Sequence, residues 1–229
     1  MKEVILLSRY NLLEAMVAQT KSTKKTTDKQ QKIVETAIKF FAEKGYANTS
    51  TSEIAKTAEV SEGTIFRHYG TKDNLLISII VPFLKESIPA MAEEAFNDIM
   101  SDNVYSFEDF LRALLKNRSA FIEDNKEIFQ IVIKEILYNE ALRNELIPYF
   151  AENIGKRLLK VIGIYQERGE LNDVPREIIQ RMVFTSVVGY FVTRFVLLPD
   201  TQKRDEEAEI EHIVRFVMDG IRNKTLNEK

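Results

Sequence analysis

The chain has 229 residues, of which 45% are hydrophobic and 29% are charged, and it contains no cysteine. This length is enough for one large domain or two modest ones. The lack of cysteine excludes disulfides, thiol catalysis and zinc fingers. The only two histidines, His68 and His212, lie far apart in sequence, so a histidine-based metal site is improbable. We therefore expect no metal and no cofactor.

Charge is distributed unevenly along the chain. Residues 21–72 contain ten Lys and Arg against six Asp and Glu, although the whole chain has a formal net charge of −3. A basic segment on an acidic body suits a polyanionic partner at one end of the molecule.

Apolar residues recur at helical spacing, and glycine (8) and proline (5) are scarce. This pattern predicts an all-α chain. No apolar run reaches the roughly 20 residues that a membrane span needs. The four apolar residues from Val4 to Leu7 are too few for a secretory signal. We expect a cytoplasmic protein without a membrane partner.

Residues 1–26 form an N-terminal extension for which two alternatives remain open. Leu6, Tyr10, Leu13 and Val17 fall on one face of a possible amphipathic helix, which would then pack on the body. The other alternative is a segment without a structural role. The polar and basic stretch that follows, over 21–29, favours flexibility.

Residues 27–72 carry the most informative pattern, and residues 73–229 are expected to form a second domain. A helix is predicted to begin near Thr27 or Asp28, both good N-cap residues, and to end at Gly45.

Two short helices follow. Ser50 and Glu53 make a capping box for a helix over 51–57. Ser61 is the expected N-cap of the next helix, over 62–69.

The connection between these two helices has the helix-turn-helix spacing. Ala55 supplies the small residue where the helices cross, and Glu59 occupies a turn position that often needs φ > 0. This motif places its second helix in the major groove of DNA.

Longer helices are predicted in the second domain. The first is bent at Pro82, another begins with a capping box at Ser106, and Pro148 interrupts a third. Their predicted ranges are 73–100, 106–123, 126–138, 142–168, 176–198 and 205–223.

The arrangement resembles the TetR family of bacterial transcriptional regulators. The residues that carry the resemblance are Phe41-Ala42-Glu43-Lys44-Gly45-Tyr46, Thr49-Ser50-Thr51, Ile54-Ala55, Val60-Ser61-Glu62-Gly63-Thr64-Ile65-Phe66-Arg67-His68-Tyr69 and Thr71-Lys72-Asp73-Asn74-Leu75. The resemblance is specific over about residues 30–76. It implies a homodimer that binds a palindromic operator of double-stranded DNA and leaves it when a small-molecule effector binds each body.

Several residues are expected to contact DNA. Gly63 would allow close approach to the DNA backbone, and Arg67 would either read guanine or clamp a phosphate. Glu62 would accept from cytosine or only stabilise the helix dipole. His68 would be structural or reach a phosphate, and Lys72 would clamp a phosphate. The full predicted set is Ser50, Thr51, Ser52, Ser61, Glu62, Gly63, Thr64, Phe66, Arg67, His68 and Lys72.

Aromatic and methionine residues suggest an apolar effector pocket in the second domain. The candidate lining residues are Phe83, Met91, Phe121, Phe129, Tyr149, Tyr165 and Phe184. The last two helices suggest the dimer contact, because one is apolar nearly all round and the other carries an apolar stripe. The candidate interface residues are Val183, Ser186, Val187, Gly189, Tyr190, Thr193, Ile210, Val214, Val217 and Ile221.

The leading hypothesis is therefore a ligand-responsive repressor, released from DNA by a small apolar or amphipathic effector. The alternative is a sequence-specific DNA-binding protein that activates, or that acts through a protein partner without an effector. An enzyme is not expected, because the sequence shows no nucleophile–base pair, metal cluster or phosphate loop.

Overall fold

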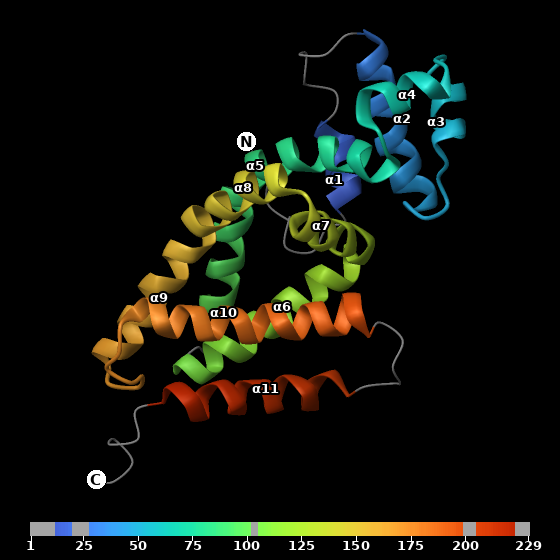
Figure 1. Ribbon diagram of the computed structural model, residues 1–229. Coiled ribbons are helices and arrows are strands. Elements are labelled where there is room, and N and C mark those ends of the chain that lie inside the picture. Colours follow the sequence, from blue (N-terminus) through green and yellow to red (C-terminus); the bar gives the residue numbers. More distant parts are fainter. Residues whose placement is uncertain (1–11, 20–27, 102–104, 199–204, 223–229) are drawn as a thin grey trace.

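The computed structural model describes residues 12–19, 28–101, 105–198 and 205–222 (Figure 1). Within these ranges the chain is helical apart from turns, and one isolated antiparallel bridge joins Leu171 and Arg222. The prediction of an all-α fold is confirmed. The predicted helix residues Leu6 and Tyr10 lie outside the described ranges.

The helices follow the predicted order. Their bounds are α1 Leu12–Gln19, α2 Asp28–Lys44, α3 Thr51–Thr57, α4 Glu62–Tyr69, α5 Lys72–Ser101, α6 Phe107–Asp124, α7 Lys126–Tyr138, α8 Glu140–Phe150, η3 Ala151–Gly155, α9 Lys156–Glu167, α10 Arg176–Val192, η4 Thr193–Leu197 and α11 Glu206–Ile221. In Figure 1 the head formed by α2, α3 and α4 lies at the upper right, and α5 leads from it into the body. Helices α10 and α11 run side by side across the lower part.

Local sequence signals set most helix ends. Ser50 and Ser106 each form a complete capping box, the first with Glu53 and the second with Asp109. Glu59 has φ 57°, as the helix-turn-helix turn requires. Ser61 occupies the N-cap of α4, but its side chain makes no capping bond.

Prolines act differently at three places. α5 continues through Pro82 and Pro89 as one element of 30 residues. Pro148 lies in the last turn of α8, directly before the π-helical turn η3, so the predicted helix over 142–168 is three consecutive segments. Wider turns of this kind accommodate a disturbed hydrogen-bond ladder. Pro175 is the N-cap residue of α10.

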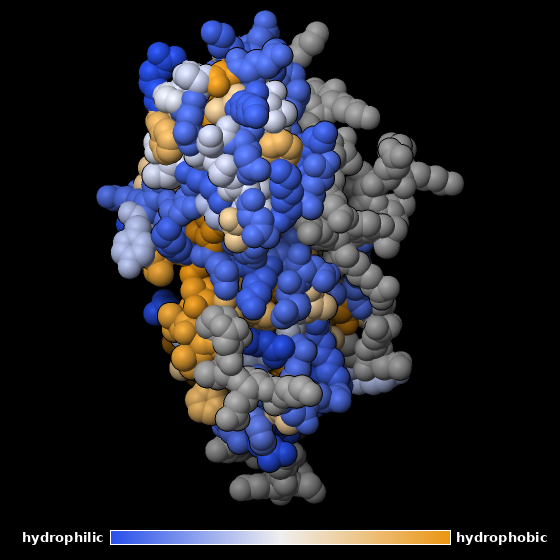
Figure 2. Space-filling view, turned by 90° about the vertical axis from the view of Figure 1, so that its right-hand side faces the viewer, coloured by the Kyte–Doolittle hydropathy of each residue, from blue (hydrophilic) through white to orange (hydrophobic). Residues whose placement is uncertain are grey.

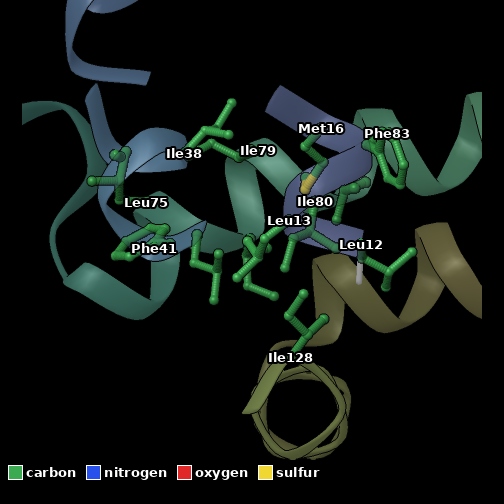
Figure 3. Close-up of a cluster of buried hydrophobic side chains, with 14 of the residues drawn as sticks. Leu12, Leu13, Met16, Ile38, Phe41, Leu75, Ile79, Ile80, Phe83 and Ile128 are labelled. Atoms are coloured by element: carbon green, nitrogen blue, oxygen red, sulfur yellow. The ribbon is translucent and has the colours of Figure 1, made fainter. Parts of the chain in front are cut away.

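The extra N-terminal helix is present over α1 and packs against both head and body. Leu12, Leu13 and Met16 are buried with side chains of α2, α5 and α7, and Figure 3 shows them facing residues such as Phe83 and Ile128. The backbone N–H of Leu12 donates to Asn125 Oδ1 at 2.6 Å. α1 is therefore part of the core.

The core has two hydrophobic clusters. The first joins head and body, from Phe41 and Ile65 to Leu146 on α8. The second holds the lower helices together around Phe107 and Tyr165. It includes most of the buried face of α11.

One described segment, Lys72–Met100, is long and apolar enough to cross a membrane, a candidate that the sequence analysis did not find. Of its most apolar window, 67% is buried inside the protein. Burial of this extent is what a core helix shows.

Candidate nucleic-acid interface

The N-terminal ends of α3 and α4 lie together on the head. Thr51 Oγ1 donates to Glu62 Oε1 at 2.6 Å and so connects the first residues of the two helices. Ser61 Oγ and Thr64 Oγ1 are 2.9 Å apart. Free backbone N–H groups and the helix dipoles at these two ends favour a phosphate.

The first residues of α4 form an exposed surface. Gly63 and Arg67 are exposed, and Phe66 is 48% exposed although it is a large apolar side chain. Among the described residues no carboxylate forms an ion pair with Arg67, so its guanidinium is available to a ligand. A Cβ built on Gly63 would meet only Ser61 Oγ, at 3.9 Å. Packing within the chain therefore does not require glycine here.

The structure places two predicted DNA contacts in other surroundings. His68 is exposed rather than in the inner position expected of a structural residue, and its Nδ1 is 3.5 Å from Gln30 Nε2. Lys72 Nζ donates to Tyr46 O at 2.6 Å and to Thr49 O at 2.7 Å. Burial lowers the pKa of Lys72. One ammonium hydrogen is left for the predicted phosphate contact.

A polar junction of Tyr46, Asp73, Glu127 and Lys134 joins the head to the body beside Lys72. The Tyr46 hydroxyl donates to Asp73, and Lys134 Nζ lies 2.5 Å from the other Asp73 oxygen. The Tyr46 N–H donates to Glu127 Oε2 at 2.8 Å. Lys134 and then Tyr46 lower the pKa of Asp73, whereas burial and Asp73 raise that of Tyr46.

Sequence reasoning missed this junction. Its partners come from the loop after α2, the start of α5 and the middle of α7, and the Tyr46–Glu127 bond spans 81 positions. A spacing pattern within one helix gives no signal for such a contact. Gly45 is the nearest local clue, because its φ of 81° favours glycine at the start of the loop that carries Tyr46.

The comparisons with known proteins agree with the geometry of the head. The family model for bacterial regulatory proteins of the tetR family matches residues 33–79. The uncharacterized HTH-type transcriptional regulator YvkB of Bacillus subtilis is 26% identical over 192 residues, covering 83% of this chain and 96% of that protein.

The chain belongs to the TetR family. It is a DNA-binding transcriptional regulator, as are the relatives that it matches.

Two further similarities cover most of the chain. The fatty acid metabolism regulator protein of Bacillus subtilis is 25% identical over 205 residues, covering 88% of this chain and all of that protein. The crystal structure of FadR from Bacillus subtilis in complex with stearoyl-CoA has a TM-score of 0.55 and 22% identity, covering 83% of this chain and 98% of that one. The structural similarity extends the TetR-family fold from the head to the body.

The candidate effector residues are not brought together. Phe83 and Met91 belong to the first cluster and Tyr165 to the second, while Phe121 packs against both. Two further candidates for the effector pocket, Phe129 and Tyr149, are partly buried. Phe184 is 57% exposed, and its assignment to the pocket stays a prediction. A depression of about 450 Å³ lies elsewhere, lined by Gln166, Glu167, Asp173, Val174, Pro175 and Arg176.

The predicted dimer residues divide into buried and exposed positions. Those of α11, and two of α10, are buried inside the subunit, in the second cluster: Val183, Val187, Ile210, Val214, Val217 and Ile221. These residues already pack within this chain, and their place in a dimer interface stays a prediction. Ser186 and Tyr190 are partly buried, and Gly189 and Thr193 are exposed.

Proposed function

We propose that the protein is a ligand-responsive homodimeric repressor that binds a palindromic operator and leaves it when an effector binds the body. The proposal of DNA binding is supported chiefly by the exposed start of α4. Gly63, Phe66 and Arg67 face solvent there, beside the N-terminus of α3. In this proposal residues 27–72 bind DNA and residues 73–229 bind effector and partner subunit. These two ranges differ in their proposed function but share one core, since the first hydrophobic cluster contains residues of both.

A second copy of the chain is the proposed partner of the exposed faces of α10 and α11. Ile178 and Met182 are 42% and 53% exposed on α10, and Phe216 is 75% exposed on α11. Figure 2 shows hydrophobic residues gathered along one edge of the molecule, below the head. Gly189 fits this role, since a Cβ there would meet no atom within 4 Å and close helix approach is possible. A two-fold dimer uses the same surface on both subunits.

The proposed effector is amphipathic. Partly buried aromatic side chains, among them Phe121 and Phe129, lie against the hydrophobic clusters and suit an apolar chain. One similar protein is named for fatty acid metabolism and another was solved with stearoyl-CoA. A long-chain acyl compound is therefore the first effector to test.

Selection of genomic fragments tests the DNA-binding part. The purified protein is mixed with fragmented genomic DNA at low and at moderate salt, and the retained fragments are sequenced. We expect a few palindromic sites to persist at moderate salt, since base contacts survive when counterion-driven binding weakens. Gly63→Leu serves as control, because it should block approach to DNA at an exposed position where an added Cβ meets only Ser61 Oγ. Retention of fragments without sequence preference would contradict a specific operator.

A further inference from the structure

One arginine lies beside the buried face of α6. Phe107, Leu111, Leu115, Ser119 and Ile122 are buried along that face. Arg118 directly precedes Ser119, lies three residues after Leu115 and four before Ile122, and is partly buried. A charged side chain therefore adjoins the buried face of this helix.

The guanidinium of Arg118 has weak partners. Its Nε donates to Asn117 Oδ1 at 2.9 Å, Nη2 donates to the same oxygen, and the group lies 5.0 Å from the ring centre of Phe121. Within the described part of the chain, no carboxylate oxygen forms an ion pair with it. Burial lowers the pKa of Arg118 to about 10, and the more distant Asp98 and Glu94 offset only part of this effect.

A second arginine of the same helix shows the usual arrangement. Arg112 Nε lies 2.5 Å from Glu211, and the same guanidinium also pairs with Asp109 and Glu108. Such pairing raises the pKa of Arg112, the opposite of the shift at Arg118. Removal of a cation from water without a counter-ion destabilises a fold. Arg118 is therefore poorly explained as a structural residue.

The position of Arg118 connects it with the candidate effector region. Phe121, on which its guanidinium lies, packs against both hydrophobic clusters. Arg118 is thus found where the two clusters approach each other, among aromatic side chains. The aromatic and methionine residues of this region predict an apolar ligand, and the charge at Arg118 changes that expectation.

We propose that Arg118 binds the anionic group of the effector, a carboxylate or a phosphate, while the apolar part of the effector lies among the neighbouring aromatic side chains. A planar guanidinium with free N–H groups suits either anion through paired hydrogen bonds. This inference rests on the effector part of the proposed function and specifies its chemistry. A neutral amphipath of the same length is then a poor ligand.

Calorimetric titration with three probes tests the inference. The full-length protein is titrated with hexadecanoic acid, hexadecan-1-ol and hexadecanoyl-CoA, and release of the operator found by selection is followed by fluorescence anisotropy. We expect one anionic probe to bind at least about tenfold more tightly than the alcohol, the usual effect of a charge-assisted bond. The acid and the thioester distinguish a carboxylate from a phosphate as the bound group.

Two variants assign the preference to Arg118. Arg118→Gln should bind the acid or thioester no more tightly than the alcohol, whereas Arg118→Lys should keep part of the preference. Lys116→Gln is the matched control, because Lys116 is on the solvent side of α6 and pairs with Glu207 at 2.8 Å. It should behave as wild type. If Arg118→Gln does not fold, titration of wild type and of Arg118→Lys with the three probes still shows whether the anion preference depends on the side chain at position 118.

Other outcomes overturn the inference in distinguishable ways. If the alcohol binds and releases the operator as well as the anions do, the effector part of the proposed function holds and the anion site is wrong. If Arg118→Gln keeps the anion preference, the anion binds elsewhere. If no probe binds wild type or releases the operator, the amphipathic effector and the anion site both fail.

Discussion

Arg67 and Lys72 are neighbouring bases of the head whose charged groups have different surroundings. Arg67 is exposed and forms no ion pair among the described residues, whereas Lys72 donates to two backbone carbonyls of the loop after α2. Substitution of Lys72 would therefore disturb the loop as well as any phosphate contact. Arg67 is the residue at which DNA recognition can be tested without loss of fold.

Arg67→Ala should relax operator specificity with little change in melting temperature. A bidentate base contact is worth about 1–3 kcal/mol of discrimination, and an exposed residue without partners contributes little to stability. Binding to the operator and to variants with one changed base pair measures the effect. Arg67→Lys is the control that keeps the charge but loses the planar group. Uniform weakening across all DNA sequences would show that Arg67 contacts only phosphate.

Asp73→Asn should destabilise the folded protein at neutral pH but not in acid. Lys134 and Tyr46 hold the folded pKa of Asp73 below its usual 3.8. This stabilisation is present above pH 3.8 and is lost as the pH falls through the lower folded value. We expect a difference of about 1 kcal/mol at pH 7, because Lys134 is exposed to solvent.

Denaturant unfolding as a function of pH measures this difference. Glu145→Gln is the control, since its pair with Lys85 has the same 2.5 Å distance but a more exposed carboxylate. Equal effects of the two substitutions at pH 7 would contradict a special role for the junction at Asp73.

At the scale of the helix, α1 connects the head to the body. Its buried side chains contact α2, α5 and α7 together, and Asn125 holds its first N–H. Met16→Ala should lower the free energy of unfolding by about 2–5 kcal/mol, as for other buried methionines. Thermal and denaturant unfolding measure the loss, and Lys29→Ala at the exposed start of α2 is the control. A loss below about 0.5 kcal/mol, typical of surface sites, would show that α1 is not part of the core.

The sequence predicted elements well where local chemistry sets them. α3 and α4 have the predicted bounds because the capping box at Ser50 and the turn at Glu59 act within a few residues. The turns η3 and η4 were not predicted, since no local signal separates a π-helical turn from an α-helical one. Periodicity showed that one face of α11 is buried but not which surface covers it. That face, with Val214, packs within the subunit.

For the whole molecule, α7 contacts both the head and η4, the segment that continues α10. Glu127 and Lys134 bond to the Tyr46 N–H and to Asp73 near the head. Gln130 donates to the carbonyl of Phe195 in η4 at 2.6 Å. A change in the position of α10 would therefore reach the head through one short helix.

A dimer through α10 and α11 predicts different results for exposed and buried substitutions. Met182→Glu combined with Phe216→Glu should give folded monomers, because both side chains are more than half exposed in the subunit. Val214→Glu should instead unfold the subunit, since a buried unpaired charge is costly. Sedimentation analysis and circular dichroism separate the two results.

The folded monomer should bind the operator far more weakly than the dimer. Two linked heads bind the two half-sites of a palindrome at a high effective concentration, and a single head loses this advantage of about 10²–10⁴. Operator binding by the Met182→Glu and Phe216→Glu double variant measures it. A dimer that survives this double substitution would show that the subunits meet through another surface, and the geometry of the two heads would then have to follow from that surface.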